Sequence, residues 1–312
     1  MTVSILRTEH AWWVLTTTGA AEILTSASST GELLQDRRAI DEAAARGGTV
    51  AVESLDLLSP LTTPCRVVAQ MTNYASHAKD SGLTPGRVPL TFFRKSSGSI
   101  SGPREAIVRP RHVRLLDYEV EIGLVIGRPI PVGTRIADGD LAHYVAGLVL
   151  ANDVSARDVQ LTRTQFYESK SYPTFTPVGP RLVLLEGSEL ARFTDLRLTL
   201  QVNSTVRQDR TAADMIYRPL QALRALTTFQ RLDPGDLVLT GTPVGTAISA
   251  PPRPVQLLAA LLPEHVKWRL FIARQQKNPK YLQDGDVLEA SIATDDGAID
   301  LGTQHTTVKW ER

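Results

Sequence analysis

The segment from Asp117 to Gly127, which reads DYEVEIGLVIG, most restricts how this chain can fold. As a β-strand it would turn Glu119 and Glu121 to one face and a row of apolar side chains to the other, because successive strand side chains alternate. Neighbouring carboxylates repel each other unless water, a proton or a cation intervenes. An exposed edge with two solvated glutamates is the ordinary interpretation of Glu-x-Glu. A hard divalent cation in a core is the alternative, and downstream residues favour it.

Length and composition narrow the class of protein. The 312 residues allow one large domain and a smaller one. A formal net charge of +1, with 21% charged residues, gives no electrostatic basis for binding nucleic acid or an acidic membrane surface. The single cysteine, Cys65, excludes an internal disulfide and a multi-thiolate metal site. Because there is neither a leader pattern over residues 1–16 nor an apolar stretch of about 20 residues, we expect a soluble, cytoplasmic protein.

The first 60 residues are expected to form a unit of their own. Short strands with a turn at Gly19 are indicated over 3–24, and helical spacing of apolar residues over 32–46 predicts a helix that Thr30 caps. Prolines near residue 60 then suggest a boundary. We therefore predict an α+β, mainly β chain with a small N-terminal α/β domain over 1–60 and a larger domain over 61–312.

Polar residues follow a predicted buried strand over 67–70. If residues 75–80 turn helically, His77 and Asp80 share a face, and the carboxylate could orient the imidazole. A surface histidine beside an acid is the alternative. The strand-like stretch 89–95 ends at Lys95, for which a solvated charge is the ordinary interpretation.

A second apolar strand, over 144–150, leads into Asp153. At the end of its strand, Asp153 could converge with Glu119 and Glu121 to give three oxygen ligands, a set that suits Mg²⁺ or Mn²⁺. Lys170 opens a proline-rich stretch and could hold a carboxylate or an oxyanion, although a lone lysine is usually solvated.

Further along, the pattern predicts a few more elements. An alternating strand is expected over 196–202, a helix from Pro219 with apolar residues as far as Phe229 on one side, and a strand over 237–239. The glycines of Thr240–Gly245 suit either close approach of a ligand or a simple turn. Residues 250–280 read as one or two inserted helices.

Six motifs in this order resemble the fumarylacetoacetate hydrolase family. They are Asn73-Tyr74-x-x-His77, Tyr118–Glu121, Asn152–Gln160, Lys170-Ser171, Pro177-x-Gly179-Pro180, and Pro234–Asp236 through Thr240–Pro243. The resemblance covers about residues 65–312 and fits poorly over 250–280. It implies a mixed β-sandwich roll and a homodimer.

The resemblance also implies roles for individual residues. A divalent metal, Mg²⁺ with Mn²⁺ or Ca²⁺ as alternatives, would be held by Glu119, Glu121 and Asp153. His77 would activate water with Asp80 as its acidic partner. The side chains implied to face a small 2-oxo acid substrate are Tyr74, Arg157, Gln160, Lys170 and Thr242.

Three departures from the family pattern concern the site. Asp80 stands where members of the smaller bacterial type usually have a glutamate, so its carboxylate is about 1.5 Å less far-reaching. Ser169 and Pro173 replace a common glycine and aspartate beside Lys170. Thr246-Ala247 replaces the usual continuation after the Thr-Gly-Thr-Pro stretch, and the 250–280 insertion follows.

These residues predict a hydrolase that cleaves a carbon–carbon bond in an acylpyruvate-like 2,4-dioxo acid through a metal-stabilised enolate. Decarboxylation, isomerisation or hydration of a 2-oxo acid through the same enolate is the alternative, because fold does not decide the reaction. A third interpretation is a metal-dependent binding protein for 2-oxo acids that has lost turnover.

Overall fold

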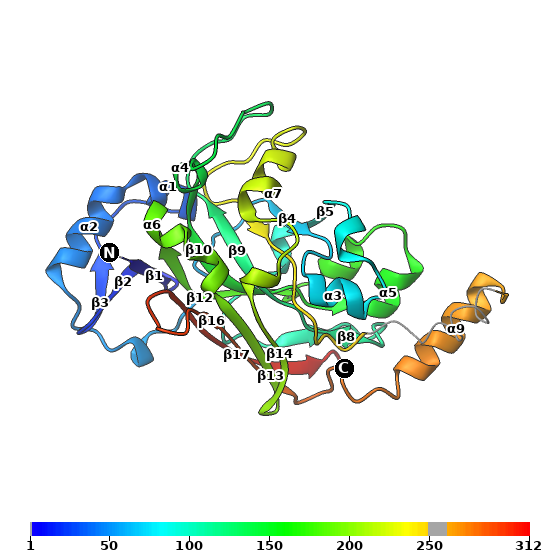
Figure 1. Cartoon of the computed structure of the whole chain (residues 1–312). Helices are drawn as coiled ribbons and strands as arrows, with labels where there is room; N and C mark the ends of the chain where they lie inside the picture. The colour runs from blue at the N-terminus through cyan, green and yellow to red at the C-terminus, as the bar shows by residue number, and fades with distance from the viewer. Residues whose placement is uncertain (1, 249–260) are drawn as a thin grey trace.

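The computed structural model describes residues 2–248 and 261–312 and shows a body dominated by β-strands (Figure 1). The strands are β1 Val3–Arg7, β2 Trp12–Thr16, β3 Gly19–Ile23, β4 Val67–Gln70, β5 Phe92–Lys95, β6 Ile100–Ser101, β7 Ile107–Arg109, β8 Leu116–Asp117, β9 Val120–Ile126, β10 Val145–Asn152, β11 Ser155–Ala156, β12 Thr176–Leu184, β13 Arg197–Val202, β14 Thr205–Thr211, β15 Leu237–Leu239, β16 Val287–Ala293 and β17 Asp300–Trp310.

Helices are short and lie around these strands. The α-helices are α1 Thr30–Gln35, α2 Arg37–Arg46, α3 Ala75–Asp80, α4 Leu141–Tyr144, α5 Arg157–Thr162, α6 Gly187–Leu190, α7 Pro219–Leu226 and α9 Glu264–Gln275. The 3-10 helices are η1 Val52–Ser54, η2 Pro85–Arg87, η3 Ser97–Ser99, η4 Glu168–Lys170, η5 Phe193–Asp195 and η6 Ala212–Asp214. The α+β, mainly β class predicted from the sequence is confirmed.

Two mixed sheets form the core. The larger has 10 strands in the order β3-β2-β1-β12-β10-β9-β15-β4-β5, with β6 paired to β12, and the smaller has 5 in the order β14-β13-β16-β17-β7. One apolar cluster includes Ile122 of β9, Leu198 of β13 and Ile292 of β16, so the two sheets pack face to face. This arrangement is the predicted β-sandwich roll.

Strand β9 lies in the middle of the larger sheet, between β10 and β15, and all of its residues are buried. Ile122 and Leu124 turn into the cluster shared with the smaller sheet, whereas Val125 faces a second cluster on the opposite side. Because side chains alternate, Glu121 shares the face of Val125. The exposed edge considered for Glu-x-Glu is therefore wrong. Gly123 suits this crowded position, since a Cβ atom would lie 2.6 Å from Leu237 Cδ1 and would force that side chain to shift.

The N-terminal segment adds three strands to the larger sheet. Strand β1 pairs with β12 in antiparallel register, with Ser4 opposite Val183, and β2 and β3 follow outward. The larger sheet thus contains strands from both sides of residue 60. The domain boundary expected near that residue stays a prediction. The single helix expected over 32–46 is wrong, because the chain breaks at Asp36 into α1 and α2.

Two further details differ from expectation. The N-cap of α1 is Ser29, because the Thr30 hydroxyl instead donates to the Pro60 carbonyl at 3.0 Å. Helix α7 ends at Leu226, so Phe229 lies beyond it and is exposed.

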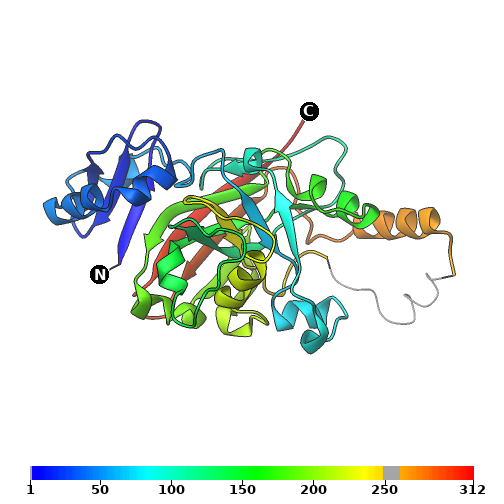
Figure 2. The same cartoon turned by 90° about the horizontal axis from the view of Figure 1, so that it is seen from above.

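Of the predicted 250–280 insertion, α9 is described, and Figure 2 shows it projecting from the body. The part of that prediction over 249–260 lies outside the described residues. None of the described helices has the length and hydropathy needed to cross a membrane.

Candidate metal and substrate site

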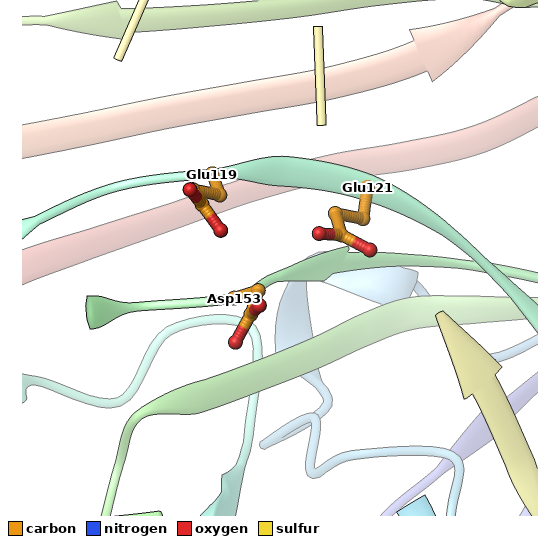
Figure 3. A group of neighbouring side chains, drawn as sticks. All are labelled: Glu119, Glu121 and Asp153. Atoms are coloured by element: carbon orange, nitrogen blue, oxygen red, sulfur yellow. The ribbon is translucent and has the colours of Figure 1, made fainter. Parts of the chain in front are cut away.

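The end of β10 and the start of β9 bring three carboxylates together. The two strands are antiparallel, with Ala151 opposite Glu121, and the Asp153 amide donates to the Glu119 carbonyl at 2.8 Å. One carboxylate oxygen from each of Glu119, Glu121 and Asp153 lies within 4.8 Å of the others. Figure 3 shows Glu119 and Glu121 on one strand, with their side chains turned to the side on which Asp153 lies. The predicted convergence of the three acids is confirmed.

Two buried lysines contact this acidic group. The Lys170 ammonium donates to Glu119 Oε2 at 2.5 Å and to Asp153 Oδ2 at 2.6 Å. The Lys95 ammonium donates to Asp153 Oδ1 and, at 2.9 Å, to the Phe175 carbonyl. Lys95 is only 2% exposed, so the solvated charge expected at this position is wrong. Buried charges are paired, and both lysines obey that rule.

Arg157 supports the acidic group from the other side. Its guanidinium contacts Glu119, donates to Asp117 at 2.8 Å and donates to the Gln160 side chain at 2.8 Å. Asp117 also accepts bonds from the amides of Tyr118 and Ala247. Arg157 and Gln160 therefore bond to each other and to the carboxylate network, and their contact with substrate stays a prediction.

The surroundings of Glu119 and Glu121 shift the pKa values of the two carboxyl groups in opposite directions. Burial opposes ionisation of Glu119, but attraction to Arg157, Lys170 and the nearby His77 outweighs it and holds the Glu119 pKa below its usual range. Among the residues that the structure describes, no cation contacts Glu121. Burial and repulsion from Asp153 and Glu119 raise its pKa well above the usual value. Burial lowers the pKa of Lys170, yet attraction to Asp153 and Glu119 raises it overall.

The loop after β15 closes over Glu121. The Gly241 amide donates to Glu121 Oε2 at 2.7 Å, and this residue has a φ of +85°, which a glycine adopts at little cost. The Thr242 hydroxyl donates to the Val120 carbonyl at 2.9 Å and accepts from Gln208 at 2.8 Å. The only proton of that hydroxyl is thus used within the protein, so Thr242 could offer a substrate no more than an acceptor.

Helix α3 carries the predicted acid–base residues. The Ser76 amide and hydroxyl both bond to the Asp214 carboxylate of η6, which fixes the start of the helix. His77 is 8% exposed, and burial lowers its pKa. Neither His77 Nδ1 nor the buried Tyr74 hydroxyl has a hydrogen-bond partner among the described residues.

Asp80 lies at the end of α3 and is exposed. No hydrogen bond joins it to His77 in the described part of the chain. Its charge nevertheless favours protonation of His77, as a weaker influence than that of Glu119. The pairing of the two residues as a catalytic dyad stays a prediction.

Sequence reasoning missed several residues that support the site. These are Lys95, Asp117, Gln208 and Asp214. For Asp117 a signal was available, since it directly precedes the Tyr-Glu-Val-Glu stretch. Gln208 and Asp214 reach the site from β14 and η6, and nothing in their local sequence indicates those contacts.

The donor set fits a hard divalent cation. All three candidate ligands offer carboxylate oxygens, as Mg²⁺, Mn²⁺ and Ca²⁺ prefer. Burial and then repulsion from Asp153 and Glu119 raise the Glu121 pKa, and a cation between the carboxylates would relieve the repulsion. Glu119, Glu121 and Asp153 would hold the ion.

Comparison with known proteins shows the family to which this chain belongs. Residues 66–309 match the model of the fumarylacetoacetate (FAA) hydrolase C-terminal family, and the chain belongs to this family. Its relatives include the mitochondrial oxaloacetate tautomerase Fahd2a of Rattus norvegicus, 35% identical over 62% of this chain and 61% of that protein. The 2,4-didehydro-3-deoxy-L-rhamnonate hydrolase of Sphingomonas sp. is 36% identical over 75% of this chain and 82% of that protein.

The matching region thus spans about three fifths of the tautomerase's length. A crystal structure described as a probable 2-hydroxyhepta-2,4-diene-1,7-dioate isomerase from Mycobacterium abscessus covers 100% of both chains, with a TM-score of 0.76 and 31% identity. Maleylpyruvate hydrolase from Sphingobium sp. SYK-6, at 22% identity and a TM-score of 0.73, shares the fold. The homologues are enzymes of hydrolase, isomerase and tautomerase type.

Proposed function

We propose that this protein is a divalent-metal-dependent hydrolase that cleaves a carbon–carbon bond in an acylpyruvate-like 2,4-dioxo acid. One observation carries the proposal. Beside the three carboxylates, His77 Nδ1 and the Tyr74 hydroxyl are buried and have no hydrogen-bond partner within residues 2–248 and 261–312. Buried polar atoms are nearly always hydrogen-bonded, so this pair calls for a ligand or water on the α3 side of the site.

The metal side would bind the 2-oxo acid end of the substrate. When bound, a divalent cation supplies positive charge beside the substrate carboxylate and 2-oxo oxygen, where enolate charge develops. Lys170 lies against Glu119 and Asp153 and offers a second cation for the same oxygens. Lys170 would thereby favour the enolate over the ketone.

His77 suits the role of general base. Its pKa is lowered by burial, so the imidazole is neutral near pH 7 and can accept a proton. His77 would take a proton from water, and the hydroxide would add to the 4-oxo carbon. The bond between carbons 3 and 4 then breaks, its electron pair passes into the enolate, and a proton restores the 2-oxo acid. The products are a carboxylic acid and pyruvate.

Two substitutions test this proposal. His77→Ala is expected to lower kcat by about 10²- to 10⁴-fold with Mg²⁺ affinity unchanged. Glu121→Ala is expected to lose both catalytic turnover and Mg²⁺ affinity. The measurements are hydrolysis of a panel of acylpyruvates and Mg²⁺ titration calorimetry. Near-native hydrolysis of every 2,4-dioxo acid by His77→Ala would rule out the water-activating role.

A second candidate is a lyase or isomerase acting on a 2-oxo acid such as oxaloacetate. Asp80 is exposed and makes no hydrogen bond to His77, which favours proton transfer without activation of water. The 35% identity to an oxaloacetate tautomerase also supports it. Product analysis with oxaloacetate, acylpyruvates and 2-oxohept-3-enedioate separates the two. Label from H₂¹⁸O in the carboxylic acid, corrected for exchange, supports hydrolysis, and release of CO₂ supports decarboxylation.

Three other features of the protein belong to this proposal. We propose that Mg²⁺ is the metal, that the partner in solution is a second copy of the chain, and that the protein acts in the cytoplasm, as expected from the sequence. Neither a nucleic acid nor a membrane is a proposed partner. Gel filtration with light scattering would test the homodimer.

A further inference from the structure

Asp153 is contacted by two lysines that are held in different ways. Lys95, at the end of β5, has a side chain that is 0% exposed. Its ammonium bonds to Asp153 Oδ1 and also to the Phe175 carbonyl, which lies outside the acidic group. Lys170, in η4, makes its two short contacts to carboxylates only.

Lys170 contacts the carboxylate oxygens that face each other. Its ammonium lies 2.5 Å from Glu119 Oε2 and 2.6 Å from Asp153 Oδ2, and so bridges two of the three candidate ligands. A divalent cation needs carboxylate oxygens of the same two residues. The ammonium and the metal therefore draw on one set of negative charges.

Lys95 contacts the other oxygen of Asp153. Since Lys170 bonds to Oδ2, the contact of Lys95 with Oδ1 fixes the rotation of the carboxylate and directs Oδ2 toward Glu119. The bond to the Phe175 carbonyl in turn fixes the ammonium. Groups that hold a metal ligand in this way typically account for about 10- to 100-fold in metal affinity.

We infer that Lys95 is a positioning residue that prepares Asp153 for a divalent cation, whereas Lys170 competes with that cation for Glu119 and Asp153. The inference rests on the metal site of the proposed function. It assigns opposite effects on metal affinity to two lysines that touch the same carboxylate.

Charge alone predicts a different result, and this makes the inference testable. Lys95→Met and Lys170→Met each remove one positive charge next to Asp153. If only Coulomb repulsion mattered, both would tighten Mg²⁺ binding. If Lys95 positions Asp153, its loss weakens binding in spite of the removed charge.

The experiment is calorimetric titration of Mg²⁺ into the metal-free full chain at one ionic strength, with no substrate. Lys95→Met is expected to bind Mg²⁺ about 10- to 100-fold more weakly than the unmodified chain. Lys170→Met is expected to bind at least about threefold more tightly, because a competing cation is gone. Equal or tighter binding by Lys95→Met overturns the positioning role, and weaker binding by Lys170→Met overturns the competition.

Two controls keep the result decisive. Circular dichroism and thermal unfolding establish that each variant is folded. If Lys95→Met does not fold, Lys95→Gln replaces it, because glutamine removes the charge but keeps a hydrogen-bond donor. Weaker Mg²⁺ binding by Lys95→Gln supports the inference, and unchanged or tighter binding overturns it. Absence of Mg²⁺ binding to the unmodified chain would instead refute the metal site of the proposed function.

Discussion

The carboxylate side of the site and the His77 side differ in how their polar atoms are paired. Glu119 and Asp153 accept hydrogen bonds from buried cationic side chains of several elements, and Glu121 accepts one from the Gly241 amide. His77 Nδ1 and the Tyr74 hydroxyl have none among the described residues. A hydrogen-bonded group is held in one geometry, whereas unpaired buried atoms have interactions still to make. The comparison indicates a preformed group of carboxylates facing a side that a ligand would complete.

The largest expected effect tests the paired side. Arg157→Met leaves Glu119 and Asp117 without their shared guanidinium in a buried environment. We expect the free energy of unfolding to fall by about 3–5 kcal/mol, as when a buried ion pair loses one partner. Urea unfolding measures this. Arg192→Met is the matched control, because its pairs with Asp195 and Asp296 are exposed, and it should cost less than about 1 kcal/mol.

A smaller effect concerns Glu121, which is buried and contacts no cation in the described part of the chain. Its folded pKa lies above its usual value of 4.5, so its contribution to stability is present below pH 4.5 and is lost as the pH rises toward the folded pKa. Glu121→Gln should therefore stabilise the metal-free protein at pH 8 by on the order of 1 kcal/mol and by less at pH 5. Urea unfolding at pH 8 and at pH 5, in the presence of a metal chelator, measures both changes in stability. The exposed Glu53→Gln should change neither, and destabilisation of Glu121→Gln at pH 8 would contradict the prediction.

On the His77 side of the site, protonation of His77 should make the free energy of unfolding depend on pH, with an effect of similar or smaller size. Because burial lowers its folded pKa below 6.5, the folded protein resists the proton that the unfolded chain accepts. Stability present above pH 6.5 should be lost as the pH falls through the folded pKa, by on the order of 1 kcal/mol. His77→Gln should remove this loss. Equal slopes of unfolding free energy against pH for the two proteins would show that His77 is not resisting protonation.

The smallest expected effect is that of Asp80→Asn. Since Asp80 is exposed and does not bond to His77, we expect kcat/KM to fall by less than about tenfold, far less than for His77→Ala. Asp80→Glu, which restores the residue common in relatives, serves as the control. A loss in Asp80→Asn as large as that in His77→Ala would mean that α3 brings Asp80 onto His77 when substrate binds.

Local pattern predicted most strands of the larger sheet and the three acids of the site, but only β13 of the smaller sheet. Alternation over 117–127 and the position of Asp153 after an apolar strand made the convergence possible, and the family resemblance implied it. The antiparallel pairing of β9 and β10 brings the end of one strand beside the start of the other. The partners of those acids could not be predicted in the same way. Lys95 has the local sequence of a surface lysine, and only the packing of β5 against the 170–176 segment buries it.

Errors at helix ends had local causes. The stretch 32–46 keeps a helical apolar period through Asp36, yet the Asp36 side chain accepts from the Ala39 amide and so begins a new helix. Helix α7 stops before Phe229 although the apolar spacing continues. Periodicity identifies which residues a helix would bury, but hydrogen bonds at its ends decide where it stops.

The pairing of β1 with β12 has a practical consequence for anyone who shortens this protein. A chain that began at residue 61 would leave the backbone amides and carbonyls of Leu182–Leu184 without the partners that β1 provides. An apolar strand edge of that kind recruits other chains. Such a fragment should precipitate at concentrations where the whole protein stays in solution, because the first 60 residues cover that edge of the sheet.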